Sequence, residues 1–124
     1  MEWEEFLDPY VQAVGELKIK LRGIRKQYRK QQRHSPIEFV TGRVKSVESI
    51  QEKMKLQGIH LENLAQDMQD IAGLRIMVQF EDDIAEVLQV LHQRQDMRIV
   101  LERDYITHKK PSGYRSYHVI IEYP

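Results

Sequence analysis

The sequence predicts an α/β or α+β domain preceded by a long amphipathic helix. Apolar residues from Trp3 to Tyr28 recur at alternating spacings of four and three residues, which is typical of a helix with one apolar stripe. After Pro36, short apolar runs typical of strands alternate with helical patterns. We therefore expect a helical arm over residues 1–36 and one domain over residues 37–124.

Capping residues and helix breakers set the expected boundaries. Asp8 can cap a helix that starts at Pro9, and Pro36 disfavours helix at the residue before it, so we expect the long helix at about 9–33. Further helices are expected at 46–57, 63–69 and 82–94, and strands at 37–45, 74–80, 97–103 and 116–122. The run at 74–80 is almost entirely apolar, which predicts a strand buried on both faces.

Composition excludes several classes of protein. Lys and Arg together number 19, as do Asp and Glu, so net charge indicates no particular partner. The absence of cysteine excludes disulfides and thiolate metal sites. No apolar run approaches the roughly 20 residues of a membrane span, and the acidic N-terminus lacks the apolar core of a signal peptide. We therefore expect a cytoplasmic protein without membrane contact.

Two polar clusters suggest phosphate and metal binding. Lys45, Ser49 and Lys53 are spaced so that a helix would place them on one face, near a helix N-terminus just after Arg43 that could meet an anion. A solvated helix face explains the same spacing. Asp70 directly precedes a strand, where carboxylates can hold Mg²⁺. Arg75 is charged within that strand, so it either forms a structural ion pair or faces a cleft.

A third cluster combines basic and aromatic residues around a glycine, at residues 104–118. Cations bind phosphates, and the flat ring of Tyr114 offers a stacking surface for a base. A plain basic loop is the alternative, but the density of these groups favours nucleotide binding. The cluster comprises Lys109, Lys110, Gly113, Tyr114, Arg115 and His118.

The segments RVKSVESIQEK (43–53), DIAGLRIMV (70–78) and DYITHKKPSGYRSYH (104–118) resemble the synthetase domain of the RelA/SpoT family. The resemblance covers nearly the whole chain, and the third segment is its most specific part. The short helical N-terminus is similar to the small alarmone synthetase branch. The resemblance implies a nucleotidyltransferase-like mixed sheet flanked by helices. It also implies a GTP pyrophosphokinase, which makes the stringent-response alarmone (p)ppGpp by moving the β,γ-pyrophosphate of ATP to the ribose 3′-hydroxyl of GDP or GTP and releasing AMP.

The same resemblance implies roles for individual residues. For ATP, Arg43 and Arg75 would stack on the adenine, while the phosphates would be held by Lys45, Ser49 and Lys53. Asp70 would hold Mg²⁺, the implied cofactor. Tyr114 would stack on the guanine of GDP or GTP, while Lys110 and His118 would contact the phosphates of the acceptor or the transferred group. Arg115 would also belong to the GDP/GTP site. Asp70, Lys53 and His118 would be the catalytic residues, since such transfer depends on positioning and charge neutralisation.

One family motif has no match. The family carries Glu-x-Gln-Ile-Arg on a later strand, and its glutamate completes the metal site, whereas Glu122 stands in a different context. We therefore expect a truncated chain with little activity of its own. The resemblance to the small synthetases also implies a homotetramer with an allosteric (p)ppGpp site in its central cleft, at residues near Phe39 and Thr41.

Other functions remain open on the sequence. Eight Lys and Arg residues and no acidic residue lie between Lys18 and Arg33, which favours a non-catalytic module that binds nucleotides or single-stranded RNA. The solvated face of an amphipathic helix would look the same. The apolar stripe of this helix could also serve oligomer contacts, and some relatives of the family modify tRNA.

Overall fold

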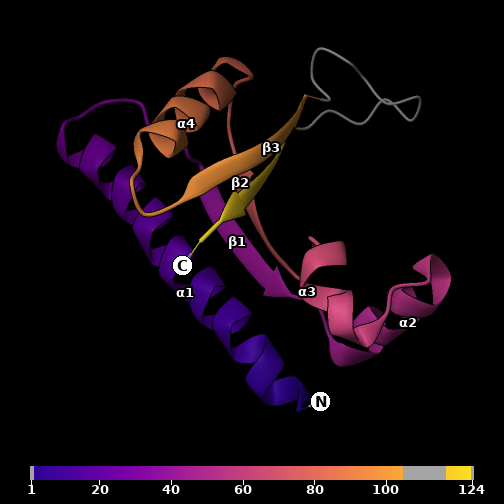
Figure 1. The fold of residues 1–124 in the computed structure, drawn as a ribbon. Coiled ribbons are helices and arrows are strands. Elements are labelled where there is room, and N and C mark those ends of the chain that lie inside the picture. The colour runs from indigo at the N-terminus through magenta and orange to yellow at the C-terminus, as the bar shows by residue number, and fades with distance from the viewer. Residues whose placement is uncertain (1, 105–116, 124) are drawn as a thin grey trace. The chain divides into compact units, whose positions relative to one another are not determined.

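The computed structural model describes residues 2–104 and 117–123, which form two compact units that divide after Met77 (Figure 1). The first unit contains, in order, α1 (Trp3–Lys30), β1 (Phe39–Val44), α2 (Val47–Gln57), the 3₁₀ turn η1 (Leu61–Asn63), α3 (Leu64–Asp67) and β2 (Ala72–Met77). The second contains α4 (Asp82–Gln93), β3 (Arg98–Asp104) and β4 (Tyr117–Glu122). The expected α+β class with a long N-terminal helix is confirmed.

Helix α1 begins at Trp3, so the expected start at Pro9 is wrong. The carboxylate of Glu2 accepts a hydrogen bond from the amide of Glu4 at 3.3 Å and caps the helix. The first turns then bury apolar side chains against a core cluster of the same unit, which offsets the backbone hydrogen bond that Pro9 removes. The partly buried side chains of these turns are Trp3, Phe6, Leu7 and Tyr10, which pack against the buried Ile50, Leu64, Met68 and Ile71.

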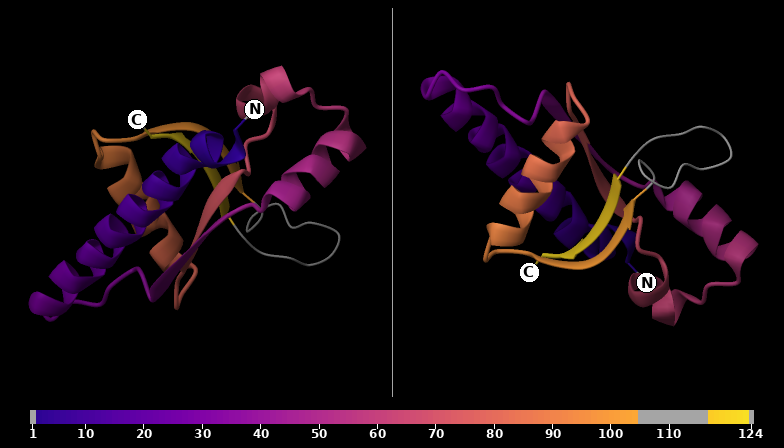
Figure 2. Two further views of the ribbon diagram at one scale, coloured as in Figure 1. Left: turned by 90° about the horizontal axis from the view of Figure 1, so that it is seen from below. Right: turned by 90° about the horizontal axis from the view of Figure 1, so that it is seen from above.

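Strands β1 and β2 form an antiparallel pair, in which Phe39 lies opposite Met77 and Val44 opposite Ala72. Helix α1 lies along this pair, and both views of Figure 2 show it beside β1. β2 alternates half-buried and exposed residues, so the expectation of a strand buried on both faces is wrong. The reason is that α1 contacts this ladder, while the opposite side carries exposed residues such as Arg75.

Local signals define α2 as expected. The hydroxyl of Ser46 accepts from the amide of Ser49 at 3.2 Å and caps the start of the helix. Gly58 ends it with a φ of 65°, a left-handed conformation that glycine adopts without strain, and its N–H bonds to the carbonyl of Met54. Ile50, on the inner face of α2, is completely buried.

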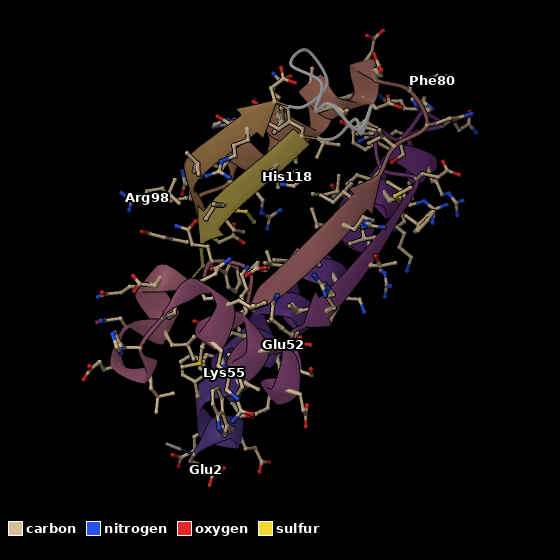
Figure 3. The ribbon with its side chains drawn as sticks, turned by 90° about the vertical axis from the view of Figure 1, so that its right-hand side faces the viewer. Glu2, Glu52, Lys55, Phe80, Arg98 and His118 are labelled. Carbon is tan, nitrogen blue, oxygen red and sulfur yellow. The ribbon has the colours of Figure 1, made fainter. Side chains whose placement is uncertain are left out.

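The second unit packs α4 against β3, which pairs with β4 in antiparallel register. Val87 and Leu91 of α4 are buried, and the buried Asp83 accepts from the amide of Phe80 at 3.1 Å before the helix. Arg98 lies opposite Glu122 at one end of this ladder, while His118 lies opposite Arg103 towards the other (Figure 3). Within 2–104 and 117–123, no helix has the length and apolar character needed to cross a membrane.

Candidate active site

Two lysines from different elements converge on one carboxylate oxygen in the first unit. The ammonium of Lys45 lies 3.1 Å from Oδ2 of Asp70, and that of Lys53 lies 2.7 Å from the same atom. Lys45 directly follows β1, Lys53 belongs to α2, and Asp70 lies just before β2. Asp70 and both lysines therefore form one group of side chains.

The backbone around Lys45 explains how this lysine reaches Asp70. It also shows that the expected common helix face of Lys45 and Lys53 is wrong. The amide of Lys45 donates to the carbonyl of Ile71 at 2.7 Å, which continues the β1–β2 pairing as far as the residue next to Asp70. Lys45 thus precedes the helix, and does not share a helical face with Lys53, because α2 begins only at Val47 after the Ser46 cap. Folding back of the chain, and not helical spacing, brings the two ammonium groups together.

Ser49 takes part in the helix cap. Its amide donates to the hydroxyl of Ser46, and that hydroxyl donates in turn to Oγ of Ser49 at 3.0 Å. The amide of Ser49 is therefore engaged, contrary to the expectation that the first amides of this helix would all be free. The side chain of Ser49 lies at the exposed N-terminus of α2, where the helix dipole favours an anion.

The lysines differ from Asp70 in exposure. The side chains of Lys45 and Lys53 are 13% and 28% exposed, whereas that of Asp70 is 48% exposed. Partial burial acts to raise the pKa of Asp70, but the hydrogen bonds and charges of Lys53 and Lys45 outweigh it and hold the pKa below its ordinary value. Asp70 therefore stays ionised at neutral pH.

Asp70 is suited to bind Mg²⁺, because its carboxylate is ionised and accessible. Both lysine bonds are made to Oδ2. The described residues contain no group of three or more His, Cys, Asp or Glu that could hold a metal by itself. Mg²⁺ in nucleotide sites is commonly bound by one or two carboxylates together with substrate phosphates. Asp70 is thus a possible protein ligand for a metal that arrives with a nucleotide.

Arg43 and Arg75 project from the exposed side of the β1–β2 pair. Arg43 lies opposite Gly73, and Arg75 lies opposite Thr41. Arg75 lies within β2, whereas Asp70 precedes the strand.

A basic groove of about 830 Å³ runs between α1 and β1, within the first unit. The run of cations in the sequence indicated a basic helix face, but the groove itself depends on how α1 packs. The guanidinium of Arg22 also donates to the carbonyl of Val40 at 3.3 Å, which ties the helix to β1. The lining includes Arg22, Arg25, Lys26 and Arg29 from α1, with Phe39 and Thr41 from β1.

Most of the predicted acceptor site lies outside the described residues, namely Lys110, Tyr114 and Arg115. His118 is described, and it is exposed on β4. Its neighbour Tyr117 donates its hydroxyl to Glu102 at 3.2 Å, and Glu102 also lies 3.3 Å from Nε2 of His92. Burial and the bond to Glu102 raise the pKa of Tyr117. Glu102 could not be predicted from the sequence, since no spacing rule links it to Tyr117.

Comparison with known proteins then identifies the family. A family model described as a region found in RelA/SpoT proteins matches residues 42–124. The chain belongs to the RelA/SpoT family. This family membership is supported by the GTP pyrophosphokinase YjbM of Bacillus subtilis, which is 58% identical over 123 residues, covering 99% of this chain and 58% of that protein.

Solved structures agree with this family. A GTP pyrophosphokinase family protein from Streptococcus pneumoniae is 75% identical with a TM-score of 0.95, covering 99% of this chain and 61% of that one. Small alarmone synthetase 1 of Bacillus subtilis, bound to its product pppGpp, is 58% identical with a TM-score of 0.94, covering 99% and 64%. The same synthetase has also been solved bound to AMPCPP. This chain spans about three fifths of the length of these relatives.

Proposed function

We propose that this protein is a (p)ppGpp synthetase, a GTP pyrophosphokinase that transfers the β,γ-pyrophosphate of ATP to the 3′-hydroxyl of GDP or GTP and releases AMP. The observation that carries the proposal is the convergence of Lys45 and Lys53 on Asp70, beside a strand pair that bears Arg43 and Arg75. Relatives named GTP pyrophosphokinase support the same activity.

The lysine group explains how ATP phosphates could be recognised. Two ammonium groups share one carboxylate, so the group formed by Lys45, Lys53 and Asp70 carries a net positive charge. A triphosphate carries more negative charge than Asp70 and offers several oxygens to the same donors. We propose that the phosphates take over Lys45 and Lys53, and that this exchange releases Asp70 from its ion pairs.

Asp70 would then hold Mg²⁺, whose charge, when bound, offsets the charge that develops on the transferred phosphates. The lysines would neutralise phosphate oxygens in the same reaction, and Ser49 would donate its hydroxyl to them. The guanidinium planes of Arg43 and Arg75 suit stacking on the adenine. For the acceptor nucleotide we propose Tyr114 as the stacking residue for guanine, with Lys110, Arg115 and His118 near the phosphates.

The activity can be tested with the protein expressed from the full reading frame that encodes these residues. Incubation with ATP, Mg²⁺ and either GDP or GTP should yield AMP and the 3′-pyrophosphorylated guanine nucleotide in equal amounts, resolved by ion-exchange chromatography. Asp70→Asn should abolish the reaction. Asp67→Asn is the matched control, because Asp67 is an exposed carboxylate on the neighbouring α3 and should leave the rate unchanged. Release of ADP instead of AMP would contradict the proposed transfer.

The basic groove supports a second, regulatory proposal. Four cationic side chains of α1 lie along one wall, and Phe39 and Thr41 lie on the other, which suits a polyphosphorylated nucleotide with an aromatic contact for its base. We propose that this groove binds (p)ppGpp as an effector, in a cytoplasmic homotetramer. Single-stranded RNA is the alternative occupant, since it would use the same cations.

Direct binding distinguishes these occupants. Arg25→Glu and Arg29→Glu should weaken binding of pppGpp, whereas Lys55→Glu on α2 changes the charge equally outside the groove and should not. If a single-stranded oligonucleotide binds tightly and pppGpp does not, the groove is an RNA site. Light scattering with an in-line chromatography column tests the tetramer.

A further inference from the structure

Four residues on the exposed side of the β1–β2 pair form a square, and their side chains differ greatly in size. Arg43 lies opposite Gly73, and Thr41 lies opposite Arg75, in the antiparallel register. All four residues are exposed and alternate with more buried residues along the two strands, and Thr41 also borders the basic groove. The two arginines therefore occupy one diagonal of the square, and Thr41 and Gly73 occupy the other.

The spacing of the arginine diagonal suits a flat ring. Diagonal neighbours on one face of an antiparallel pair are about 7–8 Å apart. A ring stacked between two planar groups needs about 3.5–4.0 Å on each side, which amounts to about the same separation. A base held between Arg43 and Arg75 would have its plane along the other diagonal, so one edge of the base would lie above Gly73.

Within residues 2–104 and 117–123, packing gives no reason for glycine at position 73. A Cβ built on Gly73 meets no atom of these residues within 4 Å, so their packing does not exclude a side chain there. Its backbone is outside the left-handed region that favours glycine, unlike that of Gly58. Glycine also weakens a strand, because it loses more conformational freedom on folding and adds no packing. Gly42 differs, since a Cβ there would lie 2.7 Å from Cγ1 of Val14.

We propose that Gly73 is a specificity-determining residue, which keeps the space between Arg43 and Arg75 open so that the base of ATP can approach the strand backbone. This inference rests on the proposed function, because it takes the arginines as the adenine site. Glycine inside a strand often marks such a close approach. A side chain at position 73 would fill the space that the base needs and leave the phosphate group at Lys45, Lys53 and Asp70 untouched.

Titration calorimetry with AMPCPP and Mg²⁺, on the full-length protein, tests the proposal. Gly73→Val should weaken AMPCPP binding by about ten- to a hundredfold, within the range expected when base stacking is lost. Gly73→Ala should have a smaller effect in the same direction. Binding of inorganic tripolyphosphate, which has no base, should stay within about twofold of wild type. Met77→Val introduces the same side chain on the same exposed face, beyond the square, and should not change AMPCPP binding.

Thermal unfolding of each variant shows whether the fold is retained, and Gly73→Ala provides a second variant should the valine protein fail to fold. Arg43→Ala and Arg75→Ala test the adenine site separately from the role of Gly73. If neither arginine variant weakens AMPCPP binding, the proposed adenine site itself is wrong. If both do, but Gly73→Val and Gly73→Ala bind AMPCPP as wild type does, the role of Gly73 is refuted while the ATP site stands.

Discussion

Replacing Gly42 with alanine should destabilise the first unit by an amount that the packing of β1 on α1 determines. A Cβ at this position would lie 2.7 Å from Cγ1 of Val14 and 3.1 Å from both Cδ2 of Leu74 and Cδ of Lys18. The end of the lysine chain can move aside, but Val14 is only 8% exposed and belongs to the core. Helix α1 or the strand must therefore shift.

The expected size follows from two opposing effects. Overpacking a core costs about 1–3 kcal/mol. Replacing glycine also restricts the unfolded chain, which stabilises the folded state by about 0.4–1 kcal/mol. We expect a net loss of about 1–2 kcal/mol, which corresponds to a melting temperature lower by about 3–8 °C for a chain of this size.

Urea unfolding followed by far-UV circular dichroism would measure this loss, with calorimetry as a second probe. Gly73→Ala is the matched control, because it makes the same change in the paired strand, where the new Cβ meets no described residue within 4 Å. It should unfold at the same urea concentration as wild type or a higher one. Equal midpoints for the two variants would refute the reasoning, since close contact between β1 and α1 would then not distinguish the sites.

Three further predictions concern the proposed site. Asp70→Ala should abolish pyrophosphate transfer in a product assay while AMPCPP binding by calorimetry falls only modestly, because the metal charge matters most in the transition state; a variant that keeps its rate would contradict this. The ion pairs of Asp70 lower its pKa, so their contribution is present above the ordinary carboxyl pKa and is lost as the pH falls below it. Because Asp70 is half exposed, this contribution should not exceed about 1 kcal/mol, seen as a steeper loss of stability in acid for wild type than for Asp70→Asn. Tyr114→Ala should weaken GDP binding by about 1–3 kcal/mol, measured by calorimetry, and an unchanged affinity would exclude stacking.

Local residue choices allowed much of the secondary structure to be predicted. Ser46 and Gly58 mark the ends of α2 through bonds to neighbours within four residues, so no distant contact is needed to place them. The start of α1 could not be predicted in the same way. Asp8 and Pro9 form a plausible local start, but burial of Trp3 and Phe6 against residues far along the chain favours a longer helix.

In the candidate site, too, the sequence indicated the residue types, whereas distant contacts set the geometry. Residue types alone pointed to Lys45, Lys53 and Asp70 as phosphate and metal ligands, because ammonium groups and carboxylates suit that chemistry. The expected helical face was nevertheless the wrong geometry, since Lys45 lies before α2 and reaches Asp70 through strand pairing. The basic run of α1 was equally visible in the sequence, but the groove depends on the contact with β1.

The sequence by itself therefore determined the long helix, the alternation of strands and helices, the family and the chemical types of the site residues. These features depend on composition, on short-range periodicity and on motifs within single segments. The tertiary structure decided that two lysines share one oxygen of Asp70, and that Arg43 and Arg75 occupy diagonal positions of the strand pair, with Gly73 opposite Arg43. Lys45 and Asp70 are 25 positions apart in the sequence, and Arg43 and Arg75 are further apart. The register of the two strands, and not the local preference of each residue, therefore decides which side chains meet.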